Sequence, residues 1–224
     1  FAENRVRFEG EHLGTDNIAV HEAGVLNQAP FQGAETAQTP MDKAQTIIEV
    51  DGTQRPAQNS NGQPIHWSEE GVRNFWRWFG DSKVVDEQGR PLVAYRGDKG
   101  HRSRFDLKDT RENAIFLTPD KDEAAVYARD GKPQPLFVQA DKVLDLTKDT
   151  QEALNFITNW AKEFPEWIDR QSGEEIEPVE AVLNGRLFDY EGTGGGERWK
   201  SLQFAALEAH DAAYLPDWGD KGGF

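Results

Sequence analysis

The spacing of apolar residues divides this chain of 224 residues into two parts. Over residues 1–64 apolar side chains are sparse, and Gln, Ala, Thr, Asn, Gly and Pro dominate, a composition typical of a linker or a wrapped extension. The exception is residues 46–50, which predict a short strand that could pair with an edge of the main sheet. Beyond residue 64 aromatic residues are frequent, and helical spacing alternates with short apolar runs. The pattern predicts an extended, linker-like N-terminal segment over residues 1–64 and a folded domain over residues 65–224.

Residues 67–97 predict a helix, a hairpin and a strand, in that order. Ser68 suits the N-cap position, and four apolar residues then recur at helical spacing on one face: Val72, Phe75, Trp76 and Phe79. A tight connection follows, with Gly89 where positive φ is favoured, and residues 92–96 form an apolar strand. This strand ends in Arg96 and Gly97, which can present a cation and a bare backbone amide to an anionic ligand.

A second unit, residues 114–129, joins a strand directly to a helix. Residues 114–117 predict a short buried strand. Thr118 suits the N-cap of the following helix, Pro119 suits its first helical position, and Tyr127 falls on the same helix. The spacing therefore predicts that the strand turns into the helix with almost no loop.

The rest of the chain continues this alternation. It predicts strands over residues 135–140, 142–146 and 212–215, and helices over residues 150–170, from about 178, and over 198–209, with a kink or break at Pro165. Together the elements predict an α+β fold built on a mixed sheet. The glycine-rich loop over residues 192–196 lacks the spaced third glycine, opening a helix after a strand, that a dinucleotide fingerprint needs. We interpret this loop as a flexible connection.

Composition narrows the classes of ligand. A net charge of −15 disfavours the phosphate-neutralising surface of a nucleic-acid-binding protein. No run approaches the roughly 18 apolar residues of a membrane span, and the start lacks a basic and then apolar secretory pattern. The chain has no cysteine, and its five histidines show no metal-ligand spacing, so we expect no metal site. Because the chain begins with Phe1, we expect it to be part of a longer polypeptide.

Three runs carry a family resemblance: WFGDSKVVDEQGRPLVAYRG, AIFLTPDKDEAAVYA and PLFVQADKVLDL. They resemble the ADP-ribosyltransferase-like domain of phage and mobile-element polyvalent proteins, and the resemblance covers residues 67–224. In that family a first strand ends in an aromatic residue, a histidine or arginine, and a glycine; a second strand carries an aromatic residue or a Ser/Thr pair, and a helix then offers a tyrosine. The matching positions are Tyr95, Arg96, Gly97, Phe116, Thr118 and Tyr127.

The resemblance implies an α+β fold with a split, mixed β-sheet core and helical insertions. It also implies that NAD is the substrate and that ADP-ribose is transferred to a protein or small acceptor. Arg96 and Thr118 would be catalytic, with Arg96 on the pyrophosphate or ribose. The NAD-binding set would be completed by one backbone contact to the nicotinamide and three aromatic positions: Gly97, Tyr95, Phe116 and Tyr127. We expect neither nucleic acid nor membrane as a partner, and a cytoplasmic location in a host cell, with delivery from a phage particle as one route.

The chain departs from the family pattern at two points. Many relatives have histidine where this chain has Arg96. The family's third element is a glutamate or glutamine on a late strand, and that strand could lie beyond Phe224. Within the chain the candidates are Glu197, Asp211 and Asp217, none of which matches that motif well. A catalytically inactive module that binds NAD or a partner protein is therefore a second hypothesis. A Rossmann-like dehydrogenase, suggested only by the glycine-rich loop, is a third.

Four of the candidate residues also have a purely structural interpretation. Arg96 could pair with Asp98 or Asp106 as an ordinary cation at the end of a strand. Phe116 and Tyr127 could pack in the core, and Thr118 could serve only as an N-cap.

Overall fold

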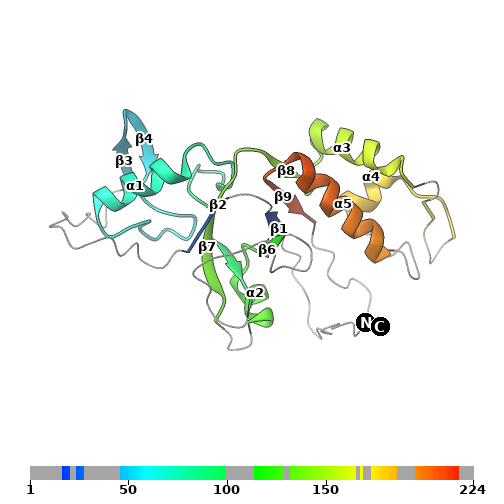
Figure 1. Cartoon of the computed structure of the whole chain (residues 1–224), viewed down its shortest axis with the longest axis horizontal. Helices are drawn as coiled ribbons and strands as arrows, with labels where there is room; N and C mark the ends of the chain where they lie inside the picture. The colour runs from blue at the N-terminus through cyan, green and yellow to red at the C-terminus, as the bar shows by residue number, and fades with distance from the viewer. Residues whose placement is uncertain are drawn as a thin grey trace.

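A computed structural model describes residues 17–20, 24–27, 46–98, 114–128, 132–164, 167–168, 173–185 and 195–216 (Figure 1). The helices are α1 (Glu69–Phe79), α2 (Lys121–Tyr127), α3 (Gln151–Ala161), α4 (Pro178–Leu183) and α5 (Gly195–Ala209). The strands are β1 (Asn17–Val20), β2 (Gly24–Asn27), β3 (Ile47–Val50), β4 (Thr53–Pro56), β5 (Ala94–Arg96), β6 (Ile115–Leu117), β7 (Gln134–Gln139), β8 (Val143–Asp145) and β9 (Ala212–Leu215). The predicted α+β class is confirmed.

The strands form three small sheets. The order in the four-stranded sheet is β6-β1-β9-β8, and the order in the three-stranded sheet is β2-β7-β5. The β8–β9 pair is parallel, while every other neighbouring pair among the described strands is antiparallel. The predicted strand at residues 46–50 forms as β3, but it pairs with β4 in a separate two-stranded sheet and not with an edge of a larger sheet.

The two larger sheets meet at one backbone bridge. The N–H of Tyr95 donates to the carbonyl of Thr118 at 2.7 Å, and the N–H of Thr118 donates to the carbonyl of Tyr95 at 3.0 Å. Strand β5 therefore joins the three-stranded sheet to the end of β6 in the four-stranded sheet. We call the surroundings of this bridge the junction; they comprise β5, residues 97–98, residues 114–120 and α2.

Besides β4, the N-terminal segment contributes two further strands that the sequence pattern did not predict. Strand β1 lies between β6 and β9, and β2 lies at the edge of the three-stranded sheet beside β7. Each strand has only four residues, and β1 is held by backbone pairing on both sides. Such pairing leaves little trace in the spacing of apolar residues.

Helix α1 forms as the sequence predicts. Ser68 is its N-cap, with the hydroxyl accepting from the N–H of Gly71 at 3.2 Å. The predicted apolar face is buried against β3 and Phe137, and Trp76 Nε1 donates to the carbonyl of Pro56 at 2.7 Å. The aromatic stripe is therefore scaffold for this end of the molecule (Figure 1).

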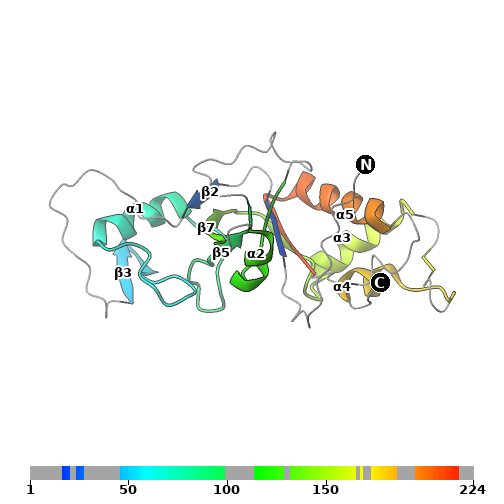
Figure 2. The same ribbon diagram turned by 90° about the horizontal axis from the view of Figure 1, so that it is seen from below.

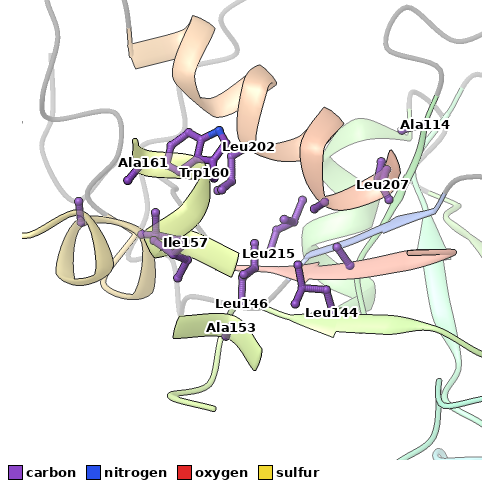
Figure 3. Packing of buried hydrophobic residues seen from close by; sticks show 14 of the residues in the cluster. Ala114, Leu144, Leu146, Ala153, Ile157, Trp160, Ala161, Leu202, Leu207 and Leu215 are labelled. Atoms are coloured by element: carbon purple, nitrogen blue, oxygen red, sulfur yellow. The ribbon is translucent and has the colours of Figure 1, made fainter. Parts of the chain in front are cut away.

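The opposite end is a helical layer formed by α3, α4 and α5 on β8 and β9 (Figures 1 and 2). Its core gathers the apolar faces of these helices around Ile157, Leu202 and Leu215, as Figure 3 shows. Arg198 lies over the rings of Phe164 and Trp167 at 4.9 and 4.8 Å, which adds cation–π contacts to the packing.

In the helical layer, two helix boundaries differ from the sequence prediction. Helix α3 begins where predicted, with Thr150 as its N-cap, but it ends at Ala161, and the chain turns at residues 162–163. Helix α5 begins at Gly195, inside the predicted glycine-rich loop. The rest of that loop lies outside the described residues.

Candidate functional site

The junction brings the six residues of the family motif together. Strand β6 leads into α2 within a few residues, and α2 lies beside β5 (Figure 2). The Tyr95–Thr118 bridge aligns the motif strand with the start of this strand-to-helix unit. Positions separated by about 30 residues in the sequence thus share one small region.

Gly97 presses its backbone against α2. A Cβ at this position would lie 2.1 Å from the carbonyl oxygen of Ala124, 2.6 Å from the Cβ of Tyr127 and 2.9 Å from the nitrogen of Ala128. Its φ is not in the left-handed region, so the need for glycine comes from the close approach of two backbones. Packing alone accounts for a glycine here, independently of any ligand.

Arg96 is largely buried at the end of β5. Its side chain is 18% exposed, its Nη1 donates to the carbonyl of Phe116 at 3.4 Å, and its Nε lies 3.5 Å from Oδ2 of Asp98. The structural alternative of an Arg96–Asp98 ion pair is therefore present, and Asp106 lies outside the described residues. Arg96 is a cation held in one orientation by a carbonyl and a carboxylate.

Tyr95 points to the other face of β5. Its ring packs against the cluster around α1, and its hydroxyl accepts a hydrogen bond from Nδ2 of Asn61 at 2.7 Å. Because successive side chains of a strand alternate between faces, the rings of Tyr95 and the guanidinium of Arg96 lie on opposite sides of the sheet. A ligand that contacts the Arg96 side chain would meet Tyr95 through its backbone.

Phe116 and Tyr127 occupy different environments. Phe116 is partly buried against the core of the helical layer, whereas its neighbours Ile115 and Leu117 face the core between the two larger sheets. Tyr127, the last residue of α2, is 55% exposed, and its Cβ lies against Gly97. Tyr127 is thus the aromatic residue of the motif that presents most surface to solvent beside the Arg96–Gly97 pair.

Thr118 does not cap α2, which corrects the prediction. Asp120 is the N-cap, and its carboxylate accepts from the N–H groups of Asp122 and Glu123 at 2.7 and 3.2 Å. The Thr118 hydroxyl, on a residue only 5% exposed, accepts from the N–H of Asp120 at 3.1 Å and donates to Oε2 of Glu123 at 2.5 Å. The helix therefore begins two residues later than predicted, and the Thr118 hydroxyl holds the N-cap residue by accepting from its N–H.

Glu123 is a buried carboxylate that the sequence reasoning missed. It is 8% exposed, and it follows the N-cap by three residues, which is the spacing of a capping box. In the usual capping box the glutamate reaches the N-cap N–H directly, whereas here the Thr118 hydroxyl lies between them. The Asp120-x-x-Glu123 spacing was the available signal.

Replacing Thr118 by valine is expected to lower the free energy of unfolding by about 1–3 kcal/mol, because the variant removes the acceptor of the Asp120 N–H and a donor to the buried carboxylate of Glu123. Thr118→Ser keeps the hydroxyl and serves as the matched control. Urea unfolding of both variants measures the difference. A valine variant as stable as the serine variant would show that this network does not stabilise the junction.

Asp211 lies at the wrong end of the strands to serve as the missing acid. Strands β6 and β9 are both antiparallel to β1. Asp211, before β9, and Thr118, after β6, therefore lie at opposite ends of the strands, about 13 Å apart along the strand direction. Its carboxylate accepts from the N–H groups of Asp141 and Lys142 at 3.1 and 2.9 Å, which makes it a turn anchor. The side chain of Glu197 and the whole of Asp217 lie outside the described residues.

Two other kinds of feature are not found in the part of the chain that the structure describes. Within these residues no three potential metal-ligating side chains of the His, Cys, Asp and Glu types come together. None of the described helices combines the length and the apolar character that a membrane crossing requires.

Comparison of the chain with protein-family models, with curated proteins and with solved structures gave no match. The resemblance to ADP-ribosyltransferase-like domains is therefore carried by the sequence motifs alone.

Proposed function

We propose that this protein is a NAD-dependent mono-ADP-ribosyltransferase that binds the dinucleotide at the junction. The observation that carries the proposal is the placement of Gly97, the residue that follows Arg96 at the end of β5, directly against Tyr127 at the end of α2. The division of the sheet at the Tyr95–Thr118 bridge supports the split-sheet arrangement of the ADP-ribosyltransferase type. In keeping with the resemblance, we propose that it acts in the cytoplasm of a host cell.

The reaction sets three demands on such a site. The bond between nicotinamide and ribose breaks, nicotinamide leaves with the bonding electron pair, and an acceptor nucleophile forms a new bond to the ribose carbon while losing a proton. The protein must therefore hold a planar cationic ring, anchor a diphosphate and stabilise positive charge developing on the ribose.

Residues at the junction can meet the first two demands. Arg96 offers a planar fork of donors whose orientation is restrained by the Phe116 carbonyl and by Asp98, which suits a diphosphate. Tyr127 offers an exposed ring beside the backbone of Gly97, which suits a flat cation. Stabilisation of the ribose calls for a further acidic or polar group.

A catalytically inactive NAD- or protein-binding module is the second candidate. It is favoured by the engagement of two carboxylates at the junction, since Asp98 pairs with Arg96 and Glu123 accepts from Thr118. The dehydrogenase hypothesis lacks support, because a Rossmann sheet is parallel, whereas one parallel pair, β8–β9, is found among the described strands.

Incubation of the full chain with NAD labelled in its adenylate part separates the candidates. A transferase is expected to label itself or an added protein mixture and to release free nicotinamide in equal amount. Binding of ADP-ribose in a calorimeter without label transfer or nicotinamide release would identify the inactive module. If the chain shows no turnover and does not bind ADP-ribose, the proposed function is refuted.

A further inference from the structure

The carboxylate of Asp98 lies beside the Arg96 guanidinium, where a ligand anion would bind. The side chains of Arg96 and Asp98 are 18% and 21% exposed, and Nε of the guanidinium lies 3.5 Å from Oδ2 of the carboxylate. By contrast, Asp81, which pairs with Arg55 at 2.6 Å, has a side chain 82% exposed. Water screens the Arg96–Asp98 pair less than a surface pair of this kind.

The Asp98 carboxylate would repel a diphosphate bound to Arg96. A ligand anion bound to the Arg96 guanidinium would lie within several ångströms of Asp98 and would be repelled by it. The chain's net charge of −15 adds to the unfavourable field. Moreover, the neutral Phe116 carbonyl holds Nη1 at 3.4 Å, so the arginine keeps one orienting contact when the carboxylate is lost.

We propose that Asp98 is an internal competitor for Arg96 and sets the affinity of the junction for diphosphate-bearing ligands. The identity of the ligand, the diphosphate of NAD, rests on the proposed function. With Asp98 in place, a weak or singly charged anion gains little from Arg96, whereas a diphosphate with further contacts to the site displaces the carboxylate. Asp98 is then a determinant of ligand selectivity at this site.

Asp98→Asn tests the proposal with a minimal change. Asparagine has the shape of aspartate and keeps an oxygen on the side chain, so the variant removes charge and little else. At low ionic strength the full-length variant is expected to bind inorganic pyrophosphate at least about tenfold more tightly than the wild type, because one like charge is removed several ångströms from the bound anion at an effective dielectric constant of about 20. Calorimetric titration measures the change.

Glu163→Gln is the matched control. Glu163 is exposed in the turn after α3, and its replacement changes the net charge by the same one unit. Pyrophosphate affinity of this variant is expected to stay within about twofold of the wild type, since Glu163 is exposed to water, lies outside the junction and makes no pair with Arg96. Equal gains from both variants would assign the effect to overall charge and would overturn the proposal.

A second measurement does not depend on the variant folding. The Nε–H resonance of Arg96 in the wild-type chain, assigned by its loss in Arg96→Lys, is expected to shift on saturation with pyrophosphate as the phosphate replaces Asp98. A resonance that does not move, an Asp98→Asn affinity equal to or weaker than that of the wild type, or no pyrophosphate binding by either chain would each overturn the inference.

ADP-ribose, titrated in parallel, keeps this inference separate from the proposed function. If Asp98→Asn gains affinity for pyrophosphate while neither chain binds ADP-ribose or consumes NAD, the proposed function fails and the competition by Asp98 stands. If both chains bind ADP-ribose with equal affinity and Asp98→Asn gains nothing for pyrophosphate, the proposed function stands and the competition fails.

Discussion

The Gly97→Ala variant is expected to lose about 3 kcal/mol of unfolding free energy, which is the upper end of the usual cost of overpacking. The added Cβ would lie 2.1 Å from the Ala124 carbonyl oxygen and 2.9 Å from the Ala128 nitrogen, both backbone atoms of the segment that forms α2 and its end. Backbone atoms of a helix cannot rotate aside as a side chain does. Relief therefore requires α2 to move away from β5, and this would open the junction.

Chemical denaturation of Gly97→Ala alongside Gly89→Ala measures this effect. At Gly89 no heavy atom lies within 4 Å of an added Cβ, but φ is +72°, so the expected cost is the strain of a left-handed alanine, about 1 kcal/mol. A Gly97 variant no less stable than the Gly89 variant would show that α2 shifts at little cost. The close contact between strand and helix would then not explain the glycine.

The local parts of the fold were the parts that the sequence predicted best. Ser68 and the apolar stripe of α1 act within a single turn or face, and both are found as their spacing predicts. The turn before β5 has Gly89 at φ +72°, as the connection required. In each case the signal and the structure that it specifies lie within about ten residues.

The features that sequence reasoning missed depend on distant partners. Strand β1 exists because β6 and β9 flank it, and neither partner is near it in the sequence. The end of α3 at Ala161 and the start of α5 at Gly195 likewise follow from the packing of the helical layer, which overrides local propensity. Pairing between distant segments cannot be read from one sequence without an independent signal.

The candidate site shows the same division. The motif predicted which positions gather, and the structure brings them together at the junction. Strand alternation alone would have separated Tyr95 from Arg96, because neighbouring side chains of a strand face opposite ways. The engagement of Thr118 by Glu123 depends on how α2 folds back on the end of β6, which spacing does not reveal.

Gly97 and Arg96 therefore need different tests, because packing explains the glycine but explains the arginine only in part. A glycine is required at position 97 by the approach of α2, whatever the protein binds. At position 96, a strand-end cation that merely paired with Asp98 could be replaced, together with its partner, by apolar residues of similar volume at little cost. Loss of activity in an Arg96 variant would therefore indicate a role in ligand binding, whereas loss of activity in a Gly97 variant could follow from disrupted packing alone.

Arg96→Ala is expected to lower kcat/KM for NAD about 100-fold, the typical cost of removing one preorganised donor group from a site of developing or bound charge. Arg96→Lys keeps the charge but loses the planar fork, so its loss is expected to be about tenfold. Arg73, which pairs with Glu69 at 2.9 Å on α1, provides the control: Arg73→Ala should leave turnover unchanged. Thermal unfolding first establishes that all three variants are folded at the assay temperature.

Turnover by Arg96→Ala within about twofold of the wild type would remove Arg96 from the site. The order wild type, lysine, alanine would instead assign to its guanidinium the anchoring of the diphosphate, because a purely structural role would make lysine as good as arginine or alanine no worse than lysine.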